Sequence, residues 1–119
     1  MEAKELMERA VRALDTHKAE DIRVLKVTDV TSLADYFVLA QGGSTTQVRA
    51  LADYVDYELG LAGVSPLRTE GYDGANWILM DYAAVVVHVF LPKTRQYYDL
   101  ERLWQDGTPV DLSDIIIEE

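Results

Sequence analysis

The chain has 119 residues, of which 49% are hydrophobic, so it is long enough to form one domain around a core of its own. Its 21 acidic and 11 basic residues give a net charge of −10, and so few cations are poorly suited to neutralising nucleic-acid phosphates. A basic protein partner suits this charge better. The absence of cysteine excludes disulfides and thiolate metal sites.

No apolar run in the sequence approaches the roughly 20 residues of a membrane span. The N-terminal segment is charged and amphipathic, without the apolar core of a signal peptide. Because a chain without cysteine also fits a reducing compartment, we expect a cytoplasmic protein that makes no contact with membranes.

The first half of the chain alternates between helical and extended patterns. Residues 3–17 predict an amphipathic helix whose apolar stripe comprises Ala3, Leu6, Met7, Ala10, Ala13 and Leu14. Residues 22–27 alternate as a strand does, and a near-continuous apolar run centred on residues 36–40 predicts a strand buried on both faces. Ser44 precedes Gln47 at the spacing of a capping box, so a long helix is expected to begin there and to end near Gly60.

The second half predicts a hairpin followed by a helix. Residues 77–82 and 85–90 form two strands two residues apart, although Ala83-Ala84 is poor turn chemistry and a register offset is expected. The segment "PLRTEG" before them is expected to be extended. A helix capped by Thr94 is predicted over residues 94–104.

These elements predict an α+β fold: a single small domain, residues 1–106, with helices packed on a mixed β-sheet. After it, residues 107–119 carry four acids and no base. We expect this acidic C-terminal tail to lie on the surface or to be partly mobile.

The turn Gly42–Ser44 is the first candidate for chemistry, because a glycine-serine turn between a strand and a helix is typical of phosphate-binding loops. It matches neither GxxxxGK[ST] nor GxGxxG. A nucleotidyltransferase site needs two carboxylates on a nearby strand to hold a divalent metal, and the nearest pair, Asp53 and Asp56, falls on the predicted helix instead. We therefore interpret the turn as a capped strand-to-helix connection and expect no catalytic residue, cofactor or metal.

The two histidines offer no clear catalytic group. His88 stands on a predicted strand without a nucleophile or carboxylate nearby in the sequence, and we interpret it as a residue on a partly exposed or interface face. His17, near the end of the first predicted helix, suits the helix dipole.

Aromatic residues gather in the second half of the chain. On the first hairpin strand Trp77, Leu79 and Asp81 share one face and the intervening residues share the other. Because helices on one side of a small sheet cannot bury both of its faces, one of these sets is expected to remain exposed as an interface. For Trp77 and the Tyr97–Tyr98 pair, core and interface both remain open, whereas Leu100 and Trp104 are expected in the core.

Three blocks of the sequence, "SLADYFVLAQGGSTTQVRALAD", "PLRTEGYDGANWILMDYAAVVVHVF" and "RQYYDLERLW", together resemble the ribosomal silencing factor family, also called Iojap-like. The resemblance runs in order from about residue 22 to residue 104. The chain departs from the family pattern at Ala83-Ala84, where Gly-Asp is usual, and at Gln41, where Thr is usual.

The resemblance implies a nucleotidyltransferase-like fold without the catalytic carboxylates, and a translational repressor rather than an enzyme. Such a factor binds ribosomal protein number fourteen of the large subunit and sterically blocks joining of the small subunit, which lowers translation when nutrients are scarce. It touches ribosomal RNA at most marginally and is a homodimer when free. Organellar relatives imply an alternative role in large-subunit maturation. A nucleotidyltransferase using Gly42–Ser44 is the remaining alternative.

Carried onto this chain, the resemblance implies a docking surface on the hairpin and on the segment "YYDLERLW". In this interpretation the rings supply contact area, and Asp81 accepts hydrogen bonds from cations of the basic ribosomal protein. The predicted binding residues are Trp77, Leu79, Met80, Asp81, Tyr82, His88, Tyr97, Tyr98 and Arg102.

Overall fold

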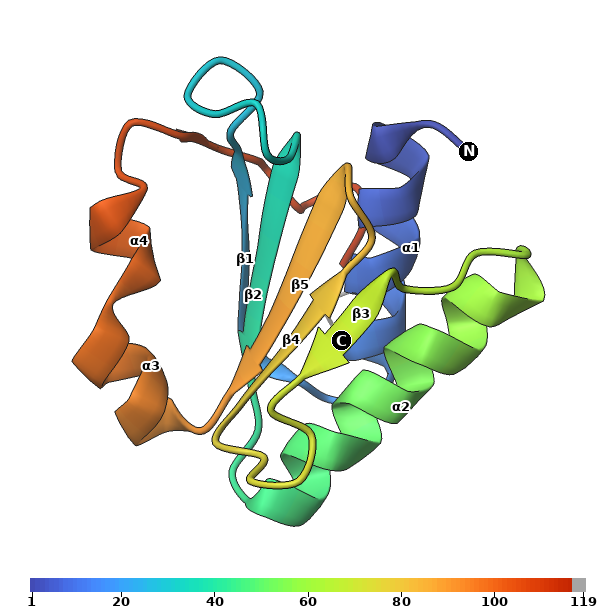
Figure 1. The fold of residues 1–119 in the computed structure, drawn as a ribbon, viewed down its shortest axis with the longest axis vertical. Helices are drawn as coiled ribbons and strands as arrows, with labels where there is room; N and C mark the ends of the chain where they lie inside the picture. The colour runs from blue at the N-terminus through green and yellow to red at the C-terminus, as the bar shows by residue number, and fades with distance from the viewer. Residues whose placement is uncertain (117–119) are drawn as a thin grey trace.

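A computed structural model describes residues 1–116 of the chain, which form one α+β domain around a six-stranded mixed sheet (Figure 1). The strand order is β3-β4-β5-β2-β1-β6. Strands β2 (Tyr36–Gln41) and β5 (Val85–Phe90) pair in parallel at the centre, and the other neighbours are antiparallel. The predicted fold class is confirmed. Within residues 1–116, no helix has the length and apolarity to cross a membrane.

Two long helices cover one face of the sheet. Helix α1 (Ala3–Thr16) and helix α2 (Thr45–Leu61) lie side by side on it, as Figure 1 shows. Their predicted apolar stripes pack against the strands, as spacing of three and four residues requires. The main core therefore lies between these helices and the sheet; its largest fully buried members include Met7, Leu14, Val38, Leu51, Leu59, Ile78 and Met80.

The opposite face of the sheet, here called the second face, is only partly covered. Helix α3 (Pro92–Tyr98) and helix α4 (Leu100–Leu103) lie on this side, across the sheet from α1 and α2 (Figure 1). A smaller core beneath them contains Leu25, Val27, Ala34, Phe37, Leu39 and Phe90. Because these two helices are short, part of the second face stays open to solvent.

The predicted helix over residues 94–104 is wrong in two respects. It begins at Pro92, at the first helical position, where the missing N–H costs nothing, so Thr94 is not its cap. It also breaks at Asp99, which adopts a left-handed conformation with φ 48°. Aspartate tolerates this conformation better than most residues. The chain changes direction there, and α4 starts as a separate turn.

The hairpin of β4 (Trp77–Asp81) and β5 has the predicted two-residue turn but no register offset. The backbone N–H of Tyr82 donates to the carbonyl of Val85 at 2.9 Å, which closes the turn. Ala83 accepts the unfavourable φ of 67°, and its N–H donates to a carboxylate oxygen of Asp81 at 2.8 Å. This side-chain bond gives the turn support that the Ala-Ala pair lacks.

On the other side of β4, Gly71 enables the connection from β3 (Arg68–Glu70), the extended piece predicted around "PLRTEG". Gly71 has φ 80°, and a Cβ there would collide with the carbonyl oxygen of Trp77. Only glycine fits this close approach.

Over its described part, the acidic tail lies on the surface of the domain and is also packed against it. Strand β6 (Thr108–Pro109) pairs with the end of β1 (Glu20–Lys26). Ile115 is buried in the main core, and Leu112 and Ile116 pack around it. Residues 117–119 lie outside the described part of the chain. The packing of Ile115 and Ile116 gives these two apolar residues of an acidic tail a role in the core.

This packing predicts that the substitution Ile115→Ala lowers the free energy of unfolding by about 2–4 kcal/mol, because it removes buried methyl groups and leaves a cavity. Urea denaturation measures the change. The neighbouring exposed residue provides the control, and Asp114→Ala is expected to shift stability by less than about 0.5 kcal/mol. Equal stability of the two variants would mean that the tail does not contribute to the core.

Candidate protein-binding surface

The side chains of β4 point alternately to the two faces of the sheet. Trp77, Leu79 and Asp81 lie half-buried on the second face. Met80 and Tyr82, on the other face, are only 2% and 6% exposed and belong to the main core. The prediction that Met80 and Tyr82 contact a partner is therefore wrong, because the period of two that places Trp77 outward turns them inward.

The second face carries an apolar groove, called here the aromatic groove, with a volume of about 250 Å³. The groove lies between strands β2, β4 and β5 on one side and the two ends of α4 on the other. Its lining combines rings and aliphatic side chains with a single ion pair: Leu33, Phe37, Arg68, Trp77, Leu79, Asp81, Val86, His88, Leu100 and Trp104. Leu100 and Trp104, expected in the core, are half-buried here.

Trp77 is held in place by three neighbours, two on β5 and one on α3. Its ring stacks on Phe90 of β5, with centroids 5.1 Å apart, and contacts Tyr98 of α3 at 5.0 Å. Its indole N–H donates to Nδ1 of His88 at 3.0 Å. The ring is thus half-exposed and fixed in orientation, so both open readings of Trp77 hold in part: it packs on the fold and also faces solvent.

His88 lies beneath Trp77, at the floor of the aromatic groove, and is almost completely buried. It is 5% exposed, so both its predicted contact with a partner and its placement on a partly exposed face are wrong. Burial lowers the pKa of His88 to about 4, which keeps the ring neutral near pH 7. Because Nδ1 accepts the bond from Trp77, the proton of the neutral ring sits on Nε2. His88 therefore supports Trp77.

Asp81 is already engaged within its own chain. One carboxylate oxygen lies 3.4 Å from Nε of Arg68 on β3, and the other accepts the N–H of Ala83. A cation of a partner would therefore join an existing ion pair. Arg68, with a side chain that is 62% exposed, places a positive charge at the same rim.

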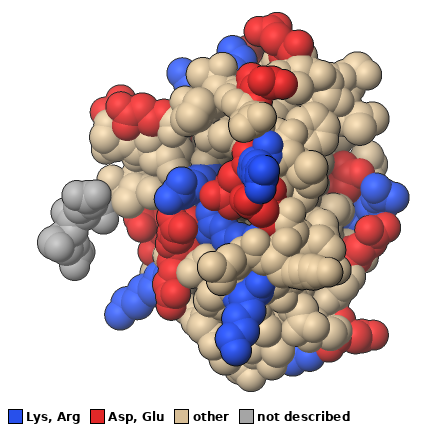
Figure 2. Space-filling model, turned by 90° about the vertical axis from the view of Figure 1, so that its left-hand side faces the viewer, with Lys and Arg blue, Asp and Glu red and all other residues tan. Residues whose placement is uncertain are grey.

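The exposed end of this surface consists of α3 and α4. Tyr97 is 75% exposed and stacks on Tyr98, which is also exposed, as is Arg102. Figure 2 shows this side of the molecule, where broad uncharged areas are interrupted by groups of both signs. The sequence interpretation missed several exposed apolar side chains, because single leucines in loops or in a one-turn helix carry no periodic signal: Leu33, Leu67 and Leu103.

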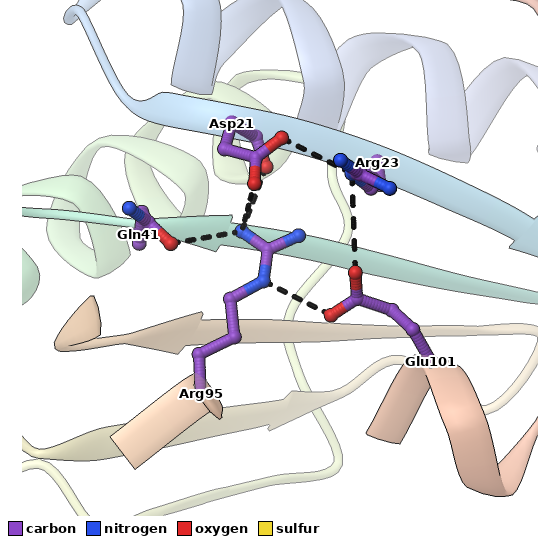
Figure 3. A network of polar contacts seen from close by, with 5 residues as sticks. All are labelled: Asp21, Arg23, Gln41, Arg95 and Glu101. Carbon is purple, nitrogen blue, oxygen red and sulfur yellow. Dashed lines mark hydrogen bonds and ion pairs between the residues drawn. The ribbon is translucent and has the colours of Figure 1, made fainter. Parts of the chain in front are cut away.

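A buried arginine, also missed, ties α3 to the sheet (Figure 3). Nη1 of Arg95 donates to the carbonyl oxygen of Asp21 at 2.7 Å and to Oε1 of Gln41 at 3.3 Å, while Nε donates to Glu101 at 3.1 Å. Asp21 sits in an irregularity of β1 with φ 46°, and Arg23 bridges the carboxylates of Asp21 and Glu101. Nothing in the sequence separates Arg95 from an exposed helical arginine.

The Gly42–Ser44 turn was the candidate for a phosphate-binding loop. Its hydrogen bonds are those expected at the start of a helix. The Ser44 hydroxyl accepts the N–H of Gln47 at 3.1 Å, which confirms the cap, and Oε1 of Gln47 accepts the N–H of Gly43 at 2.7 Å. The reciprocal bond of the capping box is therefore shifted by one residue. A Cβ on Gly42 would lie 3.2 Å from the backbone nitrogen of Val48, so the glycine permits a close approach.

The acids weighed for this turn lie away from it. Asp53 accepts the Tyr72 hydroxyl at 3.0 Å and is nine residues along α2 from Ser44, a rise of about 13 Å. Asp81 of β4 also lies at the opposite end of the sheet, because it pairs with Val86, whereas Gln41, next to the turn, pairs with Phe90 at the other end of β5. Within residues 1–116, no group of three potential His, Asp or Glu ligands is placed to hold a metal ion.

The fold and this surface define a small α+β domain with an aromatic groove on one sheet face. The sequence model of the family described as "Ribosomal silencing factor during starvation" matches residues 1–119. The ribosomal silencing factor of Halalkalibacterium halodurans is 40% identical, over 98% of this chain and 99% of that protein. A crystal structure of a Chromobacterium violaceum protein is similar with a TM-score of 0.86 and 43% identity, covering 88% of each chain. The chain belongs to the ribosomal silencing factor family.

A more distant relative is the mouse protein named "Mitochondrial assembly of ribosomal large subunit protein 1". It is 35% identical over 97 residues, which is 79% of this chain but 42% of the mouse protein.

The buried histidine predicts a pH dependence of stability. The pKa of His88 is lowered in the folded state, so its unfavourable contribution is absent above pH 6.5 and grows as the pH falls toward 4. Over that window the free energy of unfolding is expected to lose on the order of 3 kcal/mol. Denaturant titrations near pH 7 and near pH 4 measure this loss. The variant His88→Gln should lack this part of the dependence, and an unchanged dependence would contradict the assignment.

Proposed function

We propose that the protein represses translation without catalysing a reaction. It binds the large ribosomal subunit through ribosomal protein number fourteen and stands where the small subunit would join. The single observation that carries the proposal is the aromatic groove, an apolar surface with a fixed tryptophan, in a chain that belongs to the ribosomal silencing factor family.

The groove has the features of a protein-binding site. Its apolar lining and the exposed rings beside it offer contact area that is removed from water on binding, and a tryptophan is the residue most often found at the energetic centre of an interface. Trp77 loses little conformational freedom on binding because its ring is already fixed. Rigid aromatic contact area is what a steric repressor needs.

The residue roles follow from exposure. Trp77, Leu79, Tyr97 and Tyr98 supply direct contacts, and Arg102 supplies a charge at the rim. The chain's net charge of −10 favours approach to a basic ribosomal protein, which accelerates association at low ionic strength. We place this activity in the cytoplasm, with a homodimer as the free form and at most minor contact with ribosomal RNA.

Subunit joining is the direct test. When purified small and large subunits are mixed and sedimented, the protein is expected to lower the fraction of joined ribosomes in proportion to its occupancy of the large subunit. The fraction should recover when small subunits are bound first. An unchanged fraction at saturating protein would contradict the proposal.

The substitution Trp77→Ala should weaken binding to the large subunit by about 2 kcal/mol or more, about 30-fold in affinity, because it removes the fixed ring at the centre of the groove. Co-sedimentation with large subunits measures it. Leu61→Gln is the control, since Leu61 is also apolar and is 68% exposed but lies on α2, across the sheet. Equal binding by both variants would move the interface away from the groove.

Maturation of the large subunit is a second candidate, favoured by the name of the mouse relative. It would use the same surface with a different consequence. Depletion of the protein separates the two: a maturation factor leaves immature large subunits to accumulate, whereas a repressor leaves assembly intact and raises the joined fraction.

A further inference from the structure

Helix α2 carries two apolar stripes instead of one. The inner stripe faces the sheet and is buried: Val48, Leu51, Ala52, Val55 and Leu59. A second stripe repeats at intervals of four, three and four residues on the opposite side of the helix, and we call it the outer face of α2: Ala50, Tyr54, Tyr57 and Leu61. A helix that is apolar on two sides normally has neighbours on two sides.

The outer face is open to solvent. Tyr57 is 63% and Leu61 68% exposed, so most of each side chain faces solvent. Tyr54 stacks flat on His17 at the end of α1, with ring centroids 3.3 Å apart, which broadens the apolar surface toward α1. These side chains are not needed for the core, because the inner stripe already supplies it.

The spacing of the outer face is that of a helix–helix seam. Positions separated by four, three and four residues form the line that inserts between the side chains of a second helix. This pattern suits a helical partner better than an extended peptide, which would read side chains at every second position.

The charged side chains beside the outer face of α2 indicate which kind of helix could bind there. Asp53 and Glu58 lie on the two flanks of the stripe, and α2 has three acids against one base, Arg49, whose guanidinium donates to the carbonyls of Tyr72 and Asp73. Arg9 and Arg12 of α1 line the same hollow as Glu58, and Arg9 is paired with Glu5. The flank with Glu58 is therefore mixed in charge, whereas the flank with Asp53 is acidic. In a pair of α2 helices the Asp53 flank would meet an acidic flank like itself, which disfavours self-association.

We propose that the outer face of α2 binds an amphipathic helix of another protein, one with an apolar seam flanked by Lys and Arg. Helix α2 lies on the opposite side of the sheet from α3, α4 and the aromatic groove (Figure 1), so this site and the groove can be occupied together. The inference does not depend on ribosome binding.

Two synthetic peptides of about three heptads test it, both with leucine along the seam, one flanked by lysine and the other by glutamate. Fluorescence anisotropy of labelled peptide against the full chain measures affinity. The lysine-flanked peptide is expected to bind at least about tenfold more tightly than the glutamate-flanked peptide, with an affinity that falls as salt rises.

Paired variants separate the seam from charge alone. Tyr57→Ser combined with Leu61→Gln keeps every charge and should weaken binding of the lysine-flanked peptide at least about tenfold. Leu33→Gln combined with Leu103→Gln removes two equally exposed leucines elsewhere and should leave it unchanged. Loss of binding in both variants, in neither, or no binding by the parent chain would overturn the proposal. So would a dimer in sedimentation equilibrium that only the Tyr57 and Leu61 variant dissociates, since it would assign the face to a second copy.

Discussion

The second face of the sheet depends on one buried cation. Arg95 is 6% exposed, and burying a guanidinium costs several kcal/mol unless its N–H groups are paired. Nε and Nη1 are paired from three places at once: the backbone of β1 at Asp21, Gln41 at the end of β2, and Glu101 of α4. Nη2 has no hydrogen-bond partner among the described residues. An α3–α4 segment placed anywhere else would leave this charge unpaired. The arginine therefore fixes where the two short helices lie and how much of the sheet they leave open.

Two backbone irregularities make this arrangement possible. The left-handed conformation of Asp21 interrupts β1 beside the guanidinium, to which Asp21 gives its carbonyl oxygen. The left-handed conformation of Asp99 separates α3 from α4, and Glu101, two residues later, pairs with Arg95. Tyr98, at the end of α3, contacts Trp77. The network in Figure 3, which positions α3, therefore also helps to position the tryptophan of the aromatic groove. A rigid groove binds with less entropic cost than a mobile one.

The sequence predicted the features that arise from periodicity. Alternation along β4 correctly separated Trp77, Leu79 and Asp81 from the buried set, and the spacing of Ser44 and Gln47 located the start of α2. The resemblance named a segment of the hairpin as a whole, and so it brought Met80 and Tyr82 into the site although their own alternation turns them into the core. His88 was placed at the surface because a polar residue on a strand is usually exposed; its partner, the indole of Trp77, is eleven residues away and visible only in three dimensions.

The remaining differences come from long-range contacts as well. The burial of Ile115 and the pairing of β6 with β1 join residues about 85 positions apart, which no local pattern signals. Arg95 shares its residue type with exposed arginines of the same segment, and only its partners on β1 and β2 distinguish it.

A density map of the large ribosomal subunit with this protein bound would show the docking surface itself. The aromatic groove is expected to cover a surface of ribosomal protein number fourteen, with the ring of Trp77 enclosed and the outer face of α2 turned away from it. The bound protein is also expected to overlap the volume that the small subunit occupies after joining. A map in which the groove faces solvent, or in which the joining surface stays free, would contradict the proposed function.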